Sequence, residues 1–435
     1  MAWDWNMSLR ASAIVRSPRW WIAFAISFLF FLAPRLQVGI PLNGGVLAVV
    51  AAAVLGHRGL PLAARDGSLW RPCGLLVLLG IYHTVVALLY GNSFNYFLYI
   101  CVSAAVYLVV GYMLVLYLQG DRRLDAEPIN AMLLIYVAVV SVNALLIVLE
   151  YSSPQLKQVV EGILAPDPSA NIQYGDSFRN RGLAQGGGAG LSVANAIGIW
   201  ACISLWSRGA MGAPLCLLAV VCLNAANIFT GRTGLLVGLV FDAGFAVLAL
   251  ARLVKSRRVS IWSLVGIAAV AWGLVAAGQQ ITVGNDVLGW AFEWAKSGNG
   301  SSSILDTASA EDLRSMLFLP TNVVHLVFGV GFFDGVGWVY PRTDSGYLKT
   351  LLSVGLPLAA ALYGWVLWSF AKIGWLGNGL KILTIPLVIM MAGVEIKEPF
   401  LYQNCSGRFV FAMIGAYLAV RAVLRRKASL DRVGE

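Results

Sequence analysis

Arginines at the borders of apolar segments are the first candidates for chemistry in this sequence. Arg179 and Arg181 stand just before the glycine run 186–188, which leads into an apolar segment. Glycines at a helix start expose backbone N–H groups, and adjacent guanidinium groups add permanent positive charge, so this combination is typical of an anion site. The competing interpretation is a pair of loop or snorkelling arginines beside a flexible hinge. The stretch alone leaves both open.

Two further arginines have comparable positions. Arg232, in the stretch NIFTGRTGLL, lies at the start of another apolar segment, where an arginine can also serve simply to anchor a helix. Arg314 lies in a semi-polar segment that we expect to be helical, and its simplest role is an exposed salt bridge with Glu311 or Asp312, which would contribute little to stability. A functional role is the alternative for both.

Carboxylates supply the candidate general base. Asp344, in PRTDSGYL, precedes an apolar run; it can take part in catalysis, or it can cap the following helix. Asp242, in the middle of an apolar segment, should face the protein interior and have a polar partner. Glu395 and Glu398 mark the end of a later segment, where interface anchoring competes with a role in a site. His325 is interpreted as a packing histidine.

Metal and nucleotide chemistry find no support in the motifs. The chain has three histidines and six cysteines, and no two cysteines form a CxxC pair. It has no Walker motif, no GxGxxG after a strand, no DxD pair and no HExxH. We therefore expect no metal ion and no cofactor.

Apolar helices must position these groups, because the composition is that of a membrane protein. Of the 435 residues, 59% are hydrophobic and 12% are charged, with a mean hydropathy of +0.77. These values exclude an ordinary soluble domain. We expect an all-α polytopic fold, a single transmembrane domain over 1–435, with about twelve membrane-spanning helices of roughly 20 residues. The apolar segments lie near 20–33, 42–56, 72–90, 95–118, 129–149, 187–206, 210–228, 234–253, 260–278, 346–368, 379–395 and 407–424.

The net charge of +10 is a topology signal. With twelve spans and both termini in the cytoplasm, 20 of the 31 Lys and Arg residues fall on the inner side, as the positive-inside rule requires. Nucleic-acid binding is not indicated. Two long loops, 150–186 and 279–345, then face outward, toward the periplasm of a Gram-negative cell. Loops of this length are usually functional.

Four stretches, in this order, resemble the O-antigen ligase/polymerase superfamily of bacterial envelope polysaccharide assembly. They are RNRGLAQGGGAGLSVAN (179–195), FTGRTGLLVGL (229–239), DLRSMLFLPTNVVHLVFGVGF (312–332) and TDSGYLKTLLSVGLPLA (343–359). Ligases of this superfamily typically have a histidine-containing element where this chain has Thr343-Asp344-Ser345. The sequence is more similar to the Wzy-type polymerases, as is KEPFLYQ (397–403).

The resemblance implies a fold and a reaction. The fold would be of the GT-C glycosyltransferase type, in the bacterial inner membrane, with the active site facing the periplasm. The reaction would transfer a glycan from one undecaprenyl diphosphate carrier to a second lipid-linked repeat unit, without a metal ion. Arg181, Arg232 and Arg314, with Arg179 beside them, are the matching diphosphate-binding positions; Arg314 and Asp344 would be catalytic. Membrane lipids, a chain-length regulator and a flippase are the implied partners.

Two alternatives stay open. The first is an O-antigen ligase, which moves the glycan to a lipid A core. The second is a transporter or flippase of lipid-linked sugar, which should have its charged residues at mid-membrane between repeats. The arginines here gather in outward loops and only Asp242 lies mid-span, so the enzyme interpretation is preferred.

Overall fold

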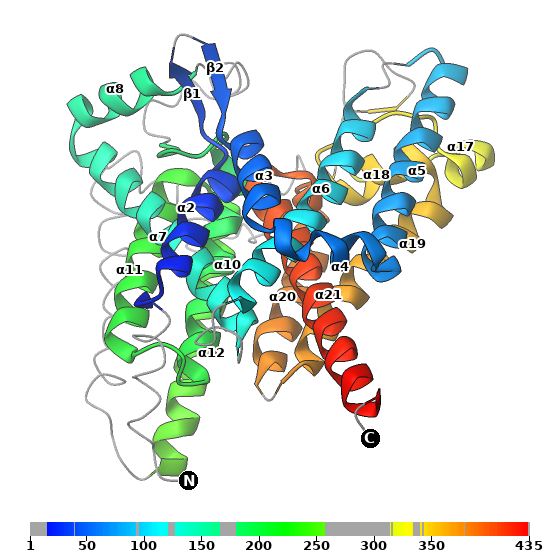
Figure 1. The fold of residues 1–435 in the computed structure, drawn as a ribbon. Helices are drawn as coiled ribbons and strands as arrows, with labels where there is room; N and C mark the ends of the chain where they lie inside the picture. The colour runs from blue at the N-terminus through cyan, green and yellow to red at the C-terminus, as the bar shows by residue number, and fades with distance from the viewer. Residues whose placement is uncertain are drawn as a thin grey trace. The chain divides into compact units, whose positions relative to one another are not determined.

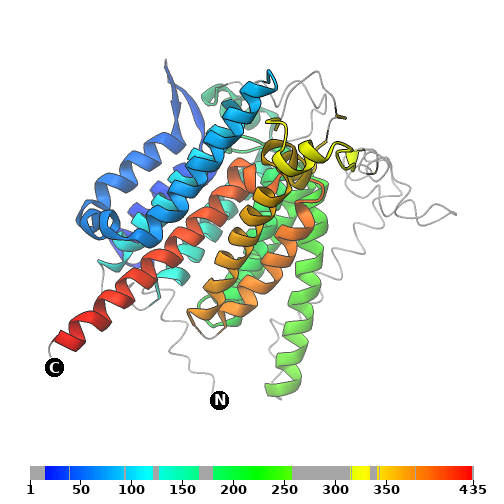
Figure 2. The ribbon, with the colours of Figure 1, turned by 90° about the vertical axis from the view of Figure 1, so that its right-hand side faces the viewer.

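The structure is a computed structural model of the chain, shown in Figure 1 and, turned by 90°, in Figure 2. It describes residues 15–38, 40–92, 95–120, 127–165, 180–256, 314, 316–333, 340–341, 343–377 and 379–433. About 81% of these residues are helical. The expected all-α class is confirmed apart from one short β-hairpin.

Eight helices in the described part are long and apolar enough to cross a membrane, so the protein is a multi-pass membrane protein. Each coincides with an expected apolar segment. They are α5 (Gly67–Leu89), α6 (Asn95–Gln119), α7 (Pro128–Ser152), α10 (Gly188–Ser207), α11 (Ala213–Thr230), α12 (Arg232–Ser256), α19 (Leu356–Ala371) with η6 (Lys372–Trp375), and α21 (Asn404–Val433).

The other four expected spans are not established as spans. The helices α2 (Pro18–Leu32) and α20 (Leu380–Val394) are apolar but contain only 15 residues each. After α3 (Gly44–Leu55) the chain bends by 60° into η2 (His57–Gly59) and α4 (Leu60–Arg65). Such a bend marks a broken span or a re-entrant loop. The segment 260–278 lies outside the described residues, so twelve spans stay a prediction.

The chain divides into two compact units. The first unit comprises Met1–Arg16, Ser27–Gly45 and Leu133–Glu311. The second comprises Ser17–Ile26, Val46–Met132 and Asp312–Glu435.

Close helix packing forms the core of the first unit. The helices α10, α11 and α12 lie against one another (Figure 1), and α10 is buried almost throughout its length. The hydroxyl group of Tyr136, on α7, donates to the carbonyl oxygen of Ala194 on α10 over 2.8 Å. A Cβ on Gly198 would lie 2.7 Å from Val140 of α7, so the absent side chain permits this approach.

The second unit is built on α5, α6 and α21, with α19 and α20 side by side (Figure 2). Two glycines bring α6 and α21 together: a side chain on Gly111 would collide with the backbone of Ala412, and one on Gly415 with the backbone of Leu108. Small residues at such crossings allow backbone contact between apolar helices.

The expected span 346–368 is broken into two helices. The helix α18 (Gly346–Val354) ends at Gly355, whose φ of 81° is open to glycine but strained for other residues, and Pro357 follows in the first turn of α19. A side chain on Gly355 would collide with the carbonyl group of Val327, at the end of α17 (Val323–Phe328). The apolar pattern alone gave no sign of the break, because both halves are apolar.

The first expected loop, 150–186, is partly helical. The helix α7 continues to Ser152, and α8 (Pro154–Ile163) follows at once, with the hydroxyl group of Ser153 accepting from the N–H of Leu156 at 3.4 Å. After α8, Leu164 pairs with Leu36 of the hairpin β1 (Arg35–Val38) and β2 (Ile40–Asn43).

Candidate functional site

The loop that carries Arg181 is held against α7 by side chains of that helix. The amide of Asn143 accepts from the N–H of Leu183 at 2.8 Å and donates to the carbonyl oxygen of Arg181 at 3.3 Å. The buried carboxylate of Glu150 accepts from the N–H of Gly182 at 3.3 Å. These bonds fix the backbone of the loop, so Arg181 projects from a defined support.

Arg232 is the first residue of α12, and its turn lies against the start of α10. A Cβ on Gly231 would be 2.8 Å from the Oγ of Ser192 and 3.1 Å from the carbonyl oxygen of Gly188, the first residue of α10. The N–H of Gly234 donates to the same Oγ over 3.1 Å. The N-termini of these two helices therefore touch, and the Arg181 loop leads directly into one of them.

This arrangement favours an anion. Each helix N-terminus carries a partial positive charge and N–H groups without partners in the helix. Arg181 and Arg232 add two permanent charges, and both side chains are half-buried. Two of the predicted diphosphate-binding residues are thus brought to one end of the first unit. Arg179 lies outside the described residues.

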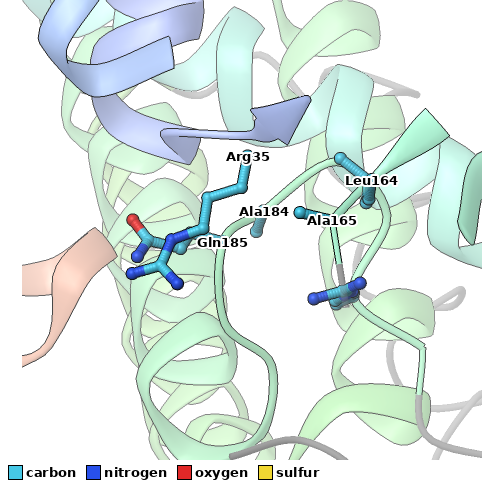
Figure 3. A pocket seen from close by; sticks show the side chains of 6 residues that line it. Arg35, Leu164, Ala165, Ala184 and Gln185 are labelled. Carbon is cyan, nitrogen blue, oxygen red and sulfur yellow. The ribbon is translucent and has the colours of Figure 1, made fainter. Parts of the chain in front are cut away.

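A third arginine, which sequence reasoning missed, lies beside Arg181. Arg35, the first residue of β1, lines a small hollow with Arg181, Gln185 and three apolar residues (Figure 3). With the amide of Gln185 turned so that its oxygen faces the guanidinium, this oxygen accepts from Nε at 3.0 Å and from Nη2 at 2.9 Å. A signal was present, since Arg35 is one of the few basic residues expected on the outer side, against the positive-inside bias.

In the second unit, Asp344 is not the N-cap of α18. The N-cap is Ser345, and no side chain caps this helix; the N–H of Ser345 is bound by the hydroxyl group of Thr343 at 3.1 Å. Asp344 is half-buried, and its carboxylate has no hydrogen bond or ion pair with any described residue. The capping alternative is therefore wrong, which leaves the carboxylate available for other roles.

Glu398 is a second carboxylate on the same side of α18. Gly346, two residues after Asp344, packs against the Cα of Pro399, and its N–H donates to the carbonyl oxygen of Glu395 over 2.9 Å. Burial raises the pKa of Glu398 to about 7; Lys397 and Lys349 lower it, and the negative charge of Asp344 adds to the increase. The two carboxylates therefore interact electrostatically, and a carboxyl group whose pKa is near 7 can act as an acid or as a base at neutral pH.

A buried hydroxyl network supports this region. Glu395, 2% exposed, accepts from the hydroxyl group of Tyr363 at 2.6 Å and from the N–H of Leu401 at 3.2 Å. The hydroxyl group of Thr350 lies 2.9 Å from that of Tyr363 and 2.5 Å from that of Tyr402. Burial raises the pKa of Glu395 to about 8, although its hydrogen bonds oppose the increase. The network joins α18, α19 and the segment after α20 around the start of α18.

The remaining candidates have simpler surroundings. Arg314 is helical and exposed, and the expected helix around it does not continue past residue 316. The Nδ1 of His325 is 2.7 Å from the hydroxyl group of Tyr340, and its ring packs on Tyr90, in agreement with the packing role expected of it. Asp242 is buried and accepts from the amide of Asn224 at 2.8 Å, so it has the expected polar partner.

No protein-family model matches the sequence, and no curated protein is significantly similar to it. The function is therefore argued from the two clusters of charged residues.

Proposed function

We propose that the protein is an O-antigen polymerase that joins undecaprenyl-diphosphate-linked oligosaccharide units at the periplasmic face of the bacterial inner membrane. The observation that carries the proposal is the pair Arg181 and Arg232 at the touching N-termini of α10 and α12, in a bundle of membrane-spanning helices. A diphosphate carried by a lipid is an anion that can reach the ends of membrane-spanning helices. A GT-C-like fold with twelve spans and cytoplasmic termini is part of the proposal.

The proposed reaction needs few groups. A hydroxyl group of the acceptor unit attacks the anomeric carbon of the donor glycan, and the bond from this carbon to the diphosphate oxygen breaks. Guanidinium groups of Arg181, Arg232 and Arg314, with Arg179 beside them, bind the diphosphate and stabilise the charge that it gains as it leaves. Asp344 takes the proton of the attacking hydroxyl group. The products are the lengthened glycan and undecaprenyl diphosphate.

The carboxylate cluster supports the second half of this reaction. Asp344 is half-buried without a hydrogen-bond or ion-pair partner among the described residues, and its negative charge acts on Glu398 in a neighbouring segment. A carboxylate in such surroundings can accept a proton without first breaking an ion pair.

Complementation tests the proposal. The gene is expressed in a strain that lacks its O-antigen polymerase, and the lipopolysaccharide is resolved by size. We expect the wild type to restore a ladder of many repeats, whereas the null strain keeps single-repeat caps. Replacing Arg181, Arg232 or Arg314 by Gln should collapse the ladder while the protein level in the membrane holds. A normal ladder from Asp344→Asn would remove Asp344 as the base.

Deletion of the gene from its own host separates the alternatives. If the deletion strain lacks even single-repeat caps and the gene restores them, the protein is a ligase that transfers glycan to a lipid A core. If the deletion strain accumulates lipid-linked units on the cytoplasmic face and the gene clears them, it is a flippase. The position of Asp242 disfavours a flippase, because its carboxylate is bound to Asn224 in the packed interior of the first unit.

A further inference from the structure

We propose that Arg35, oriented by Gln185, is a further phosphoryl-binding residue that acts with Arg181 on the diphosphate of the lipid-linked donor. The inference rests on the proposed function, since it names a residue for the same substrate. It begins from the hollow in the first unit that Arg35, Gln185 and Arg181 line together (Figure 3).

The hollow is built by backbone hydrogen bonds between three separate segments. The carbonyl oxygen of Arg35 accepts from the N–H of Ala165 at 2.7 Å, next to the pairing of Leu36 with Leu164. The carbonyl oxygen of Leu32 accepts from the N–H of Gln185 at 2.8 Å. Both residues are therefore fixed at their backbones, and the amide of Gln185, turned so that its oxygen faces the guanidinium, orients the exposed side chain of Arg35.

The guanidinium of Arg35 retains binding capacity in this position. With the amide of Gln185 turned in this way, its only side-chain partner among the described residues is this neutral amide, which uses Nε and one N–H of Nη2. A guanidinium has five N–H donors, so three remain. Arg181, which also interacts with the Glu150 carboxylate below the loop, contributes a second guanidinium to the same hollow. The other residues that line it are Leu164, Ala165 and Ala184.

These features select a phosphoryl anion. A planar donor fork matches the oxygens of a phosphate, and the described lining holds no carboxylate to compete for it. The adjoining helix α8 has an exposed apolar face, with Val159 59% and Ile163 46% exposed one turn apart. Short helices of this kind lie at the membrane–water boundary. The phosphate is therefore one that a lipid carries.

Binding to the full-length chain tests the inference. The protein is placed in phosphatidylcholine nanodiscs, and its affinity for undecaprenyl diphosphate is measured without any acceptor. We expect Arg35→Gln to weaken binding by about tenfold, the effect of losing one charge-assisted contact. Arg35→Lys should recover only part of this, because an ammonium group lacks the fork. Gln185→Glu should weaken binding although Arg35 is still present, because the new carboxylate pairs with it.

Controls separate the sources of the phosphate. Arg58→Gln removes an exposed arginine outside the site and should bind like the wild type. Nanodiscs that contain phosphatidylglycerol supply a lipid headgroup phosphate; the difference between wild type and Arg35→Gln should persist in them. If phosphatidylglycerol abolishes the difference, the hollow binds headgroups and the donor assignment is wrong.

The inference and the proposed function can fail separately. If Arg35→Gln and Gln185→Glu both bind undecaprenyl diphosphate like the wild type, the inference is wrong, whatever complementation shows. If the wild type binds undecaprenyl diphosphate through Arg35 but restores no ladder, the site stands and the polymerase proposal falls. If the wild type binds no undecaprenyl diphosphate, both are wrong.

Discussion

Each unit contains one of two candidate clusters, of arginines in the first unit and of carboxylates in the second, on supports of different kinds. In the first unit, Arg35, Arg181 and Arg232 stand on backbone that hydrogen bonds and close glycine contacts hold in place. In the second unit, Asp344 and Glu398 lie beside a buried network of hydroxyl groups around Glu395.

The difference follows from how each group is ionised. An arginine is charged at any physiological pH, so the protein needs only to place it. A carboxylate changes its proton affinity with its surroundings, so the protein must also control burial and neighbouring charge. The arginines of the first unit should therefore depend on their positions, and the carboxylates of the second unit on their protonation states. Experiments that change one property at a time can separate them.

The largest effect is expected from the arginines of the first unit. Arg181→Gln and Arg232→Gln should each lower the rate of glycan transfer by about 100-fold or more, because each removes a group that stabilises the leaving diphosphate. The Lys variants should keep an intermediate rate, since they keep the charge but lose the fork. The measurement is polymer formation by the purified protein, with Arg58→Gln as the control. Equal rates for the Lys and Gln variants would show that geometry, not charge, is being lost.

The carboxylates should differ from the arginines in their response to pH. Burial, with the charge of Asp344, raises the pKa of Glu398 to about 7. Glu398 therefore becomes negatively charged only as the pH rises through this value. A proton acceptor gains strength there, and the transfer rate should increase across neutral pH. Glu398→Gln should remove this increase and lower the rate above neutral pH by about tenfold. Facing groups that tune the response are Lys397, Lys349 and Gln403. If the pH profile of the Glu398→Gln variant shows the same inflection, the titrating group is not Glu398.

Stability should depend on pH through the second unit. The pKa of Glu395 is about 8 in the folded protein and 4.5 in its ordinary state, so the folded protein binds this proton more tightly. The stability from the protonated group is fully present below 4.5 and is lost as the pH rises through about 8. The melting temperature should fall over this range by several degrees. Glu395→Gln, which carries no charge at any pH, should lose the part of this decline that Glu395 causes; a decline as large as that of the wild type would contradict the assignment.

The smallest effects are expected from matched glycine substitutions. A side chain on Gly346 would collide with the carboxyl group of Glu395, and one on Gly234 with the backbone of Ser192. Each Ala variant should lose about 1–3 kcal/mol of stability through overpacking. Gly393→Ala is the control, because no atom lies within 4 Å of its Cβ position. Thermal unfolding followed by tryptophan fluorescence measures all three. Unchanged unfolding of Gly346→Ala would show that the start of α18 is free to move.

Much of the helical architecture follows from composition. Eight apolar segments became the eight long helices because each is long enough to satisfy its backbone hydrogen bonds internally in lipid. The break at Gly355 was missed because an apolar pattern runs through it, and only the contact with Val327 shows why the chain turns there.

The candidate site was foreseen in part. Arg181 and Arg232 were selected from their position before apolar segments, and the structure brings them to adjoining helix starts. Arg35 was not selected, because its neighbour Gln185 is 150 positions away in the sequence. Asp344 was weighed against an N-cap, and this choice depends on a single hydrogen bond that no pattern of residues specifies.

Residue types and spacing alone established a multi-pass helical protein with scarce charges at the ends of its apolar segments, because hydrophobicity is a property of each segment by itself. Which charges share a site depends on contacts between distant segments. The packing of Gly231 against Ser192 and of Gly346 against Pro399 determines which charged residues lie together. Hydrogen bonds and burial act over a few ångströms in space, whatever the separation along the chain.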